Sequence, residues 1–277
     1  MICLVGESIG FRVTKIMNIT TIKTPLISYV VLIKNEGKQL KSLFELLSKY
    51  MVNNECIILD DFSDDSDTNE ILKELRTRES FSIYQHKLAG DYSEHRNSVF
   101  EFCKGEYIVS IDGDEIPSEF LLKNLPEIFK ANTEIELYWV SRMNDFNGVY
   151  PSISKQYGWT LTPAESITRE KMIDNASEEY KFLKENGYIM EETEIIKYKV
   201  PLVNWPDYQT RIFKNLPHIR WRGRLHERIN GNRNYVFLPK EEDFAFYHNK
   251  TIKKQMETNL RYNKEFSKED NLGLKCK

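Results

Sequence analysis

The sequence predicts an α/β fold with a mostly parallel central sheet flanked by helices. Between residues 26 and 145, short apolar runs of strand length alternate with segments of helical periodicity, and each apolar run ends in a polar segment. This alternation is typical of parallel strands joined by crossover helices. After residue 145 it stops, so the chain is expected to continue as an irregular second half.

The first three strand–helix units occupy residues 26–103. The strand Leu26–Ile33 is rich in β-branched residues and precedes a helix with apolar residues at 40, 43, 44 and 47. The strand Cys56–Leu59 precedes a helix with apolar residues at 71, 72 and 75. The strand Phe81–Gln85 is joined through polar residues 90–96 to a helix with apolar residues at 99, 102 and 103.

The fourth strand lies in Tyr107–Glu115, where an apolar run stops at Asp112 and Asp114 with Gly113 between them. Glycine permits a tight turn or a close approach to a ligand. Paired carboxylates at a strand end suit Mg²⁺ or Mn²⁺, which prefer hard oxygen ligands. The alternative interpretation is an acidic turn in which Asp114 or Ser118 caps the next helix.

Later segments are described by composition more than by periodicity. A helix with apolar residues at 121, 122, 125 and 129 precedes a strand over Ile135–Met143. Ser152–Thr162 is aromatic and rich in turn residues, whereas Glu165–Glu185 is charged and expected to be helical. All four tryptophans lie in the second half of the 277 residues, at 139, 159, 205 and 221. This favours an acceptor-binding role because flat aromatic faces pack on sugar rings, although each tryptophan is individually better explained as core. A final helix carries apolar residues at 252, 256 and 260.

Composition excludes several classes of protein. The 277 residues are 40% hydrophobic with a net charge of −3, which indicates a packed core and gives no reason to expect nucleic-acid binding. Cys3, Cys56, Cys103 and Cys276 form no Cys-x-x-Cys pair, which indicates a reducing compartment. No apolar run approaches the ~20 residues of a membrane helix, so a cytoplasmic protein with at most peripheral membrane contact is expected. The first 17 residues make a poor signal peptide, and Met17 is a candidate start.

Polar segments follow the first, second and fourth strands, and they are expected to meet at one edge of the sheet. They are Lys34–Gly37, Asp60–Asp67 and Asp112–Glu115. Ligands of open α/β sheets bind at the carboxyl ends of the strands. Neither a Gly-x-Gly-x-x-Gly loop nor a phosphate-binding Gly-Lys-Ser/Thr loop follows a strand, which disfavours dinucleotide oxidoreductases and P-loop enzymes. The aspartate run is not an EF-hand. Counted from Asp61, the sixth position is Ser66 where the motif has glycine, and the twelfth is Leu72 where it has glutamate.

Two further segments are dense in functional residue types: Trp205–Asn215, which contains Arg211, and Trp221–Ile229, which contains His226 and Glu227. The His-Glu pair is not the zinc-protease motif because position 230 is Asn. A metal ligand beside a general base is one interpretation of this pair, and a surface histidine with an ion-paired glutamate is the other.

Together these segments resemble the family 2 glycosyltransferases, which have the nucleotide-sugar-binding fold called GT-A. The resemblance covers residues 26–145, with further markers to about residue 255. Asp60–Asp65 is similar to the family's Asp-Asp-Gly-Ser-x-Asp signature with Phe62 in place of glycine, and Asp112–Asp114 is similar to its metal-binding Asp-x-Asp. Arg96 and Asn97 match an Arg-Asn pair before the fourth strand. The segments around Arg211 and Glu227 resemble a bacterial branch that includes lipopolysaccharide-core transferases.

The resemblance implies a division into an N-terminal extension (1–25), a GT-A domain (26–250) and a C-terminal helix and tail (251–277). Residues 26–145 form the nucleotide-sugar-binding half and 146–250 the acceptor half. The implied donor is a nucleoside-diphosphate sugar, with UDP the first expectation, and the acceptor is a glycan, a lipid-linked molecule or a protein. The nucleotide-sugar-binding candidates are Asn35, Glu36, Asp60, Asp61, Ser63, Arg96, Asp112, Gly113 and Arg211.

Within this site, Asp61 or Asp60 is expected to accept a hydrogen bond from the base. Asp112 and Asp114 are expected to hold Mn²⁺ or Mg²⁺, with His226 or His248 completing the coordination. The family inverts the anomeric carbon by direct displacement, which requires a base to take the acceptor's proton. Glu227 is the first candidate for this base and Asp145 is the second.

Two other functions remain open at this point. A sugar-phosphate nucleotidyltransferase usually carries a Gly-rich, Arg-containing loop after its first strand, where this chain has Lys34–Gly37. A GT-A module that binds but has lost turnover is disfavoured by the retained aspartates, because carboxylate clusters without a cation cost stability.

Overall fold

A computed structural model describes residues 27–172, 174–267 and 270. The N-terminal extension, including Cys3, Met17 and the first residue of the predicted first strand, lies outside the described residues, as does the end of the tail with Cys276. Cys56 and Cys103 are buried free thiols. Within the described part of the chain, no helix is long and apolar enough to cross a membrane.

A seven-stranded sheet in the order β14-β6-β11-β4-β1-β2-β3 forms the centre of the molecule. Its parallel part consists of β1 (Ile27–Ile33), β2 (Glu55–Asp60), β3 (Phe81–Gln85) and β4 (Tyr107–Asp112), as the alternation predicts. The antiparallel strand β11 (Gln209–Lys214) joins β4 to β6 (Leu137–Val140), and β14 (Tyr235–Phe237) pairs in parallel with β6.

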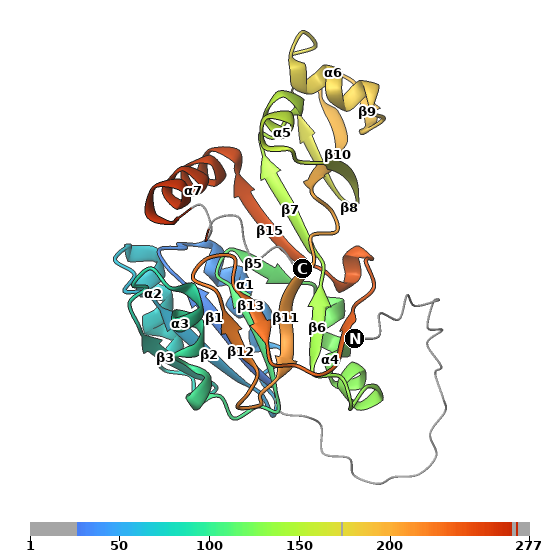
Figure 1. The fold of residues 1–277 in the computed structure, drawn as a ribbon. Coiled ribbons are helices and arrows are strands. Elements are labelled where there is room, and N and C mark those ends of the chain that lie inside the picture. The colour runs from blue at the N-terminus through green and yellow to red at the C-terminus, as the bar shows by residue number, and fades with distance from the viewer. Residues whose placement is uncertain (1–26, 173, 268–269, 271–277) are drawn as a thin grey trace.

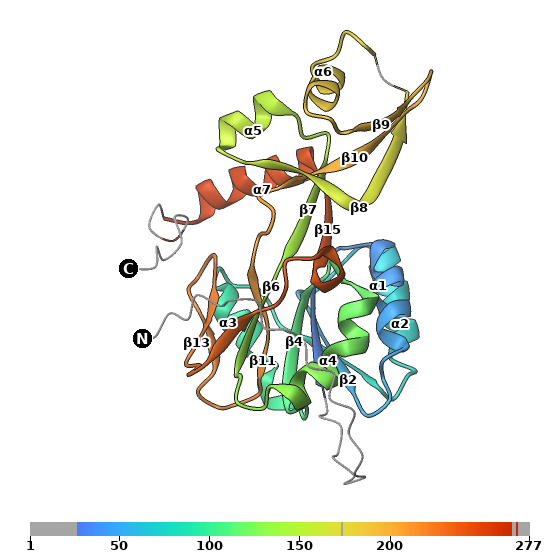
Figure 2. The ribbon, with the colours of Figure 1, turned by 90° about the vertical axis from the view of Figure 1, so that its right-hand side faces the viewer.

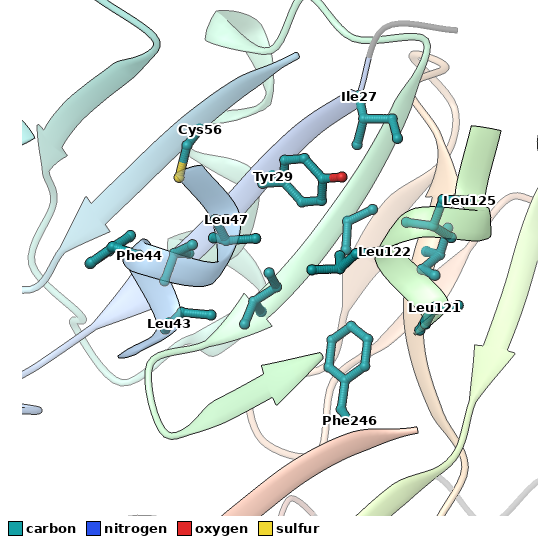
Figure 3. Packing of buried hydrophobic residues seen from close by; sticks show 14 of the residues in the cluster. Ile27, Tyr29, Leu43, Phe44, Leu47, Cys56, Leu121, Leu122, Leu125 and Phe246 are labelled. Atoms are coloured by element: carbon teal, nitrogen blue, oxygen red, sulfur yellow. The ribbon is translucent and has the colours of Figure 1, made fainter. Parts of the chain in front are cut away.

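Helices α1 (Gln39–Ser48), α2 (Ser66–Leu75) and α4 (Glu119–Ala131) cover one face of this sheet (Figure 1). Ser118 caps α4 by accepting a hydrogen bond from Leu121 N at 3.0 Å. Alternating residues of β1 serve the two faces, since Tyr29 packs beside α1 and α4 (Figure 3) whereas Val30 packs in the opposite core. That second core includes residues of η1 (Phe100–Phe102), β12 (Arg220–Arg222) and β13 (Arg228–Asn230), and α3 (Tyr92–Asn97) lies against β12.

A second sheet continues from the carboxyl edge of the first, in the order β5-β15-β7-β10-β8, with β9 paired to β10. Its strands are β5 (Glu115–Pro117), β15 (Phe246–Thr251), β7 (Arg142–Asn147), β10 (Ile196–Val203), β8 (Leu161–Lys171) and β9 (Ile189–Glu192). Together with α5 (Pro151–Tyr157) and α6 (Glu178–Glu185) it projects away from the central sheet (Figure 2). The 3₁₀ turn η2 (Glu242–Phe244) precedes β15, and α7 (Ile252–Glu265) follows it.

Three sequence expectations about these elements are wrong. Ile135–Met143 is not one strand, because its halves pair in different sheets: β6 with β11, and β7 with β10 and β15. Residues 165–171 extend β8 because they pair with β10, and this cross-strand pairing overrides the helical composition, so the helix is confined to α6. The helix expected up to residue 103 divides into α3 and η1.

Candidate active site

The three polar strand ends lie together, as predicted. In the parallel register Leu32 pairs with Asp112 and Ile33 pairs with Asp60, so β1, β2 and β4 end at the same level. The turn after β1 is bonded to the loop after β2. Asn35 N donates to Ser63 Oγ at 3.0 Å, and Asp64 N donates to Asn35 Oδ1 at 2.9 Å.

Phe62, which stands where the family signature has glycine, adopts a positive φ of 52°. Only glycine enters this region without steric cost. Half of the Phe62 side chain is exposed, so few contacts offset that cost. The turn therefore has a backbone conformation that glycine would adopt freely, although Phe62 occupies it.

The two leading aspartates have different environments. Asp60 is completely buried, and its carboxylate accepts bonds from Ser63 N at 2.9 Å and Gln85 Nε2 at 3.0 Å. Asp61 is half-buried and accepts a bond from Leu88 N at 2.9 Å through Oδ1. Because Asp60 holds the loop itself, Asp61 is the carboxylate better suited to a ligand.

A chain of buried ion pairs runs through Asp112. Arg96 Nη2 lies 2.7 Å from Asp112 Oδ1, and Arg211 Nη2 lies 2.6 Å from Oδ2. Arg96 continues the chain through Nε to Glu227 Oε1 at 2.5 Å. Arg211 continues it to the fully buried Glu115 at 2.6 Å. Four of the sequence-predicted candidates, Arg96, Asp112, Arg211 and Glu227, thus share one network.

On its far side, the network reaches the second sheet. Arg142 bridges Glu115 at 3.2 Å and Asp207 at 2.7 Å. Burial acts to raise the pKa of Asp112, but Arg211 and Arg96 outweigh it and leave that pKa well below its usual range. The Asp112 carboxylate is therefore held ionised by protein cations.

Asp114 has a separate set of partners. Its Oδ2 lies 3.3 Å from His248 Nε2 and 3.0 Å from Lys250 Nζ. These two groups lower the pKa of Asp114 against the opposing effect of burial. Gly113 beside it packs tightly, since a Cβ there would lie 2.8 Å from Glu36 Cγ and 3.0 Å from Leu32 O. The glycine is thus required by the packing against β1.

Glu36 adds a further carboxylate near Asp114. Burial and the charge of Asp114 raise its pKa, whereas Lys254 of α7, 3.3 Å away, acts in the opposite direction. Of these side chains, the carboxylate of Asp114 and the imidazole of His248 are donor types that suit a divalent cation. The 3.3 Å between Asp114 Oδ2 and His248 Nε2 matches adjacent ligands of one ion, which lie roughly 3 Å apart when each bond is about 2.1 Å.

Only some of the predicted metal ligands lie close together. Across residues 27–172, 174–267 and 270, no group of three His, Cys, Asp or Glu side chains is arranged to hold a metal ion. Asp112 has both oxygens on arginines, and His226 is exposed with its ring 6.2 Å from that of Tyr262 in α7. Asp114 and His248 are the pair that the structure brings together.

The two candidate bases occupy different places. Glu227 is joined to Asp112 through Arg96. Asp145 is 1% exposed and pairs with Arg169 at 2.7 Å and Tyr247 at 2.5 Å, while its Oδ1 is buried without a hydrogen-bond partner.

Sequence reasoning missed several residues of this site, namely Glu115, Arg142, Asn144, Asp207 and Lys250. Glu115 directly follows the Asp-x-Asp segment, and Arg142 and Asn144 lie at the end of the predicted strand 135–143, so these positions were the available signals. The others come from segments far away in the sequence.

A sheet whose parallel strands carry Asp61, Asp112, Asp114 and flanking arginines at their carboxyl edge is typical of the class of α/β proteins that bind a ligand at that edge. Residues 28–181 match the family model described as glycosyl transferase family 2. The chain belongs to this family. The predicted family and GT-A fold are confirmed.

The similar proteins agree with this assignment. The chain is 30% identical over 115 residues to the SPbeta prophage-derived glycosyltransferase SunS of Bacillus subtilis strain 168, a stretch covering 42% of this chain and 25% of SunS. It therefore spans about a quarter of that relative's length. The crystal structure of S. aureus TarS 1-349 in complex with UDP-GlcNAc is 15% identical with a TM-score of 0.51, covering 81% of this chain and 58% of TarS. The UDP complex of the same protein gives a TM-score of 0.50 at 14% identity, covering 91% and 75% of the two chains.

Proposed function

We propose that this protein is an inverting glycosyltransferase that moves a sugar from a nucleoside-diphosphate sugar, with UDP as the nucleotide, to a hydroxyl of a glycan, lipid-linked or protein acceptor. The observation that carries the proposal is the joining of Asp112 to Glu227 through Arg96 at the carboxyl edge of the sheet. Family membership and a fold shared with a UDP-GlcNAc complex support it.

On the donor side, Asp61 is the acceptor for a ring N–H of the base, because Asp60 already bonds to two protein donors. Asn35 and Ser63 shape the adjoining wall through the bond between the β1 and β2 loops. Glu36 lies beside them and accepts a bond from Gln39 of α1. Arg96 and Arg211 bring positive charge to the same edge, where they favour the diphosphate.

Asp114 and His248 would hold Mn²⁺ or Mg²⁺, with Asp112 next to them. When bound, the cation supplies charge stabilisation to the departing diphosphate. Lys250, 3.0 Å from Asp114, places a further positive charge at this position.

Glu227 is the proposed base. Arg96 orients its carboxylate through Oε1, and the side chain retains some exposure to solvent. An acceptor hydroxyl that reaches Glu227 transfers its proton to the carboxylate as its oxygen attacks the anomeric carbon on the face opposite the diphosphate. Asp145 is the second candidate, although its carboxylate is buried between Arg169 and Tyr247.

Calorimetric titration of UDP into the protein, with and without Mn²⁺, tests the donor half of the proposal. Tighter binding with Mn²⁺ is the expected result, and it should disappear in Asp114→Asn, whose fold is checked by circular dichroism. GDP, CMP and dTDP are titrated in parallel. If UDP fails to bind under either condition while another nucleotide binds, the assignment to UDP is wrong.

The base is tested by comparing Glu227→Gln with Asp145→Asn once a UDP-sugar and an acceptor support turnover. Removing a general base typically costs 10²–10⁴-fold in rate. Glu227→Gln is expected to lose about this much kcat and to retain UDP affinity within about threefold, because glutamine Oε1 can still accept from Arg96. A full rate in Glu227→Gln, combined with a large loss in Asp145→Asn, would transfer the role to Asp145.

A further inference from the structure

Two consecutive residues of α3, Arg96 and Asn97, both contact the hairpin formed by β12 and β13. Arg96 bonds to Glu227, the proposed base, which directly precedes β13. Asn97 bonds to β12 instead. Its Nδ2 donates to Trp221 O at 3.0 Å, and its Oδ1 accepts from Trp221 N at 3.0 Å. One short helix therefore holds this hairpin at two points.

The side chain of Asn97 pairs with Trp221 as a neighbouring strand would. A primary amide carries a donor and an acceptor on one planar group, so it can bond to the N–H and the C=O of one residue together. Residues of an antiparallel pair alternate between facing their partner strand and facing away from it, and Trp221 presents both backbone groups to α3. Asn97 thus bonds to the edge of β12 that faces α3.

The hairpin needs support of this kind. β12 and β13 have three residues each and form a two-stranded sheet of their own. Hairpins of this size are marginally stable in water and depend on packing against other elements. Trp221 and Ile229 pack in the second core, but apolar packing is non-directional and does not by itself fix the position of a strand. The two bonds of Asn97 are directional, so they fix the hairpin against α3.

The position of Trp221 also determines the surface on which Arg96 lies. The Trp221 ring packs against the Arg96 guanidinium, whose Cζ is 4.8 Å from the ring centroid. Trp221 is 2% exposed, and Arg96 Nε meets Glu227 Oε1 at 2.5 Å. A shift of the hairpin would therefore move the guanidinium and the carboxylate that it orients relative to the carboxyl edge of the sheet.

We propose that Asn97 is a positioning residue, which fixes Trp221 and thereby sets where the hairpin presents Glu227 to the acceptor hydroxyl. The catalytic part of this inference rests on the proposed function, in which Glu227 is the base, whereas the two bonds that hold the hairpin do not. Misplacing a reacting group by about 1 Å can cost roughly 10²-fold in rate. Nucleotide affinity should change little, because Asp61 and Asp114 lie on other loops.

The test compares the same substitution at two asparagines. Asn97→Leu removes both bonds to Trp221 with a side chain of similar shape. Asn54→Leu is the matched control, because Asn54 also accepts from one backbone N–H, Ile27 N at 2.9 Å, and donates to one backbone carbonyl, Tyr50 O at 2.7 Å. Both asparagines are half-buried, and Asn54 lies at the amino end of β1, away from the site. Urea unfolding measures the stability that each substitution costs.

Hydrogen exchange of the amides in residues 219–231, followed by mass spectrometry, reports how firmly the hairpin is held. Exchange there is expected to rise in Asn97→Leu and to match the wild type in Asn54→Leu. Turnover is measured as UDP released from a panel of UDP-sugars that includes UDP-GlcNAc. Asn97→Leu should lose about 10–100-fold in kcat and keep its UDP affinity within about threefold, whereas Asn54→Leu should keep both.

A double substitution separates positioning from a general loss of stability. If Asn97 acts through Glu227, Asn97→Leu should lower kcat little further in a protein that already carries Glu227→Gln, whereas independent effects would multiply. Asn97→Asp is a milder variant for use if leucine prevents folding. It keeps an acceptor for Trp221 N but sets a second acceptor against Trp221 O, so its kcat should lie between those of the wild type and Asn97→Leu.

Each result bears on a separate part of the inference. Unchanged exchange in the hairpin of Asn97→Leu shows that Asn97 does not hold the hairpin. An unchanged kcat in Asn97→Leu, or losses that multiply in the double substitution, overturn the positioning role while the proposed function stands. A full rate in Glu227→Gln overturns the base of the proposed function and the catalytic part of this inference with it, and the exchange result still decides whether Asn97 holds the hairpin.

Discussion

Replacing Arg211 should show how strongly its ion pairs with Asp112 and Glu115 stabilise the fold. Its side chain is 5% exposed and bridges Asp112 and Glu115 through two contacts of 2.6 Å. Replacement by methionine keeps most of the side-chain volume but leaves two carboxylates with one partner fewer. Removing one member of a buried ion pair typically costs 3–5 kcal/mol.

The lower end of that range applies here, because each carboxylate retains another cation. Asp112 keeps Arg96 and is 25% exposed, whereas Glu115 is 0% exposed but keeps Arg142 at 3.2 Å. We expect Arg211→Met to lower the free energy of unfolding by about 3 kcal/mol. At roughly 2–4 °C per kcal/mol, the melting temperature falls by about 6–12 °C.

Urea unfolding followed by circular dichroism measures the change. The control is Lys49→Met, which removes an ion pair to Glu119 whose side chains are both 58% exposed, and which is expected to cost below about 1 kcal/mol. Glu115→Gln combined with Arg211→Met should cost less than the sum of the single changes. If Arg211→Met lowers the free energy of unfolding no more than Lys49→Met does, the ion pairs of Arg211 do not stabilise the fold as argued.

Three further predictions concern other parts of the molecule. Burial lowers the pKa of His95 to about 4, from roughly 6.5 in an unfolded chain. As the pH falls, the unfolded state therefore binds the extra proton first. The contribution of His95 to the free energy of unfolding is fully present above pH ~6.5, and it declines by at most about 3 kcal/mol as the pH falls to about 4. In urea unfolding measured across this pH range, His95→Gln should reduce the decline in the free energy of unfolding. An unchanged decline would refute the lowered pKa of His95. Phe62→Gly should stabilise by about 0.5–1 kcal/mol in thermal melts because it relieves the positive φ, whereas Phe62→Ala, which keeps a Cβ, should show no gain. Gly105→Ala should destabilise by about 1–3 kcal/mol in the same assay, because its Cβ would lie 2.4 Å from Ser28 N; a neutral result would show that the backbone gives way there.

Periodicity predicted most of the elements between residues 27 and 131. The strands β1 to β4 and the helices α1, α2 and α4 depend on apolar patterns that are local in the sequence, and they lie where those patterns placed them. The meeting of Asp61 and Asp112 at one edge was also predictable, because parallel strands place their carboxyl ends at the same level.

The second half was harder to predict because its strands are defined by their partners. The charged segment that ends at Lys171 is a strand because β10 lies beside it, and its composition alone favoured a helix. The segment 135–143 likewise divides at Ser141, where the chain passes from one sheet to the other.

The sequence by itself therefore determined the class of fold and the carboxylates at the strand ends, since both follow from local pattern. Only the tertiary structure determined which cation neutralises which carboxylate. Arg96 and Glu227 are 131 positions apart, and Arg211 and Asp112 are 99 apart. Burial of charge requires a partner, but no local rule in the sequence selects that partner across such distances. The fold selects it by bringing β4, α3, β11 and the β12–β13 hairpin to one point.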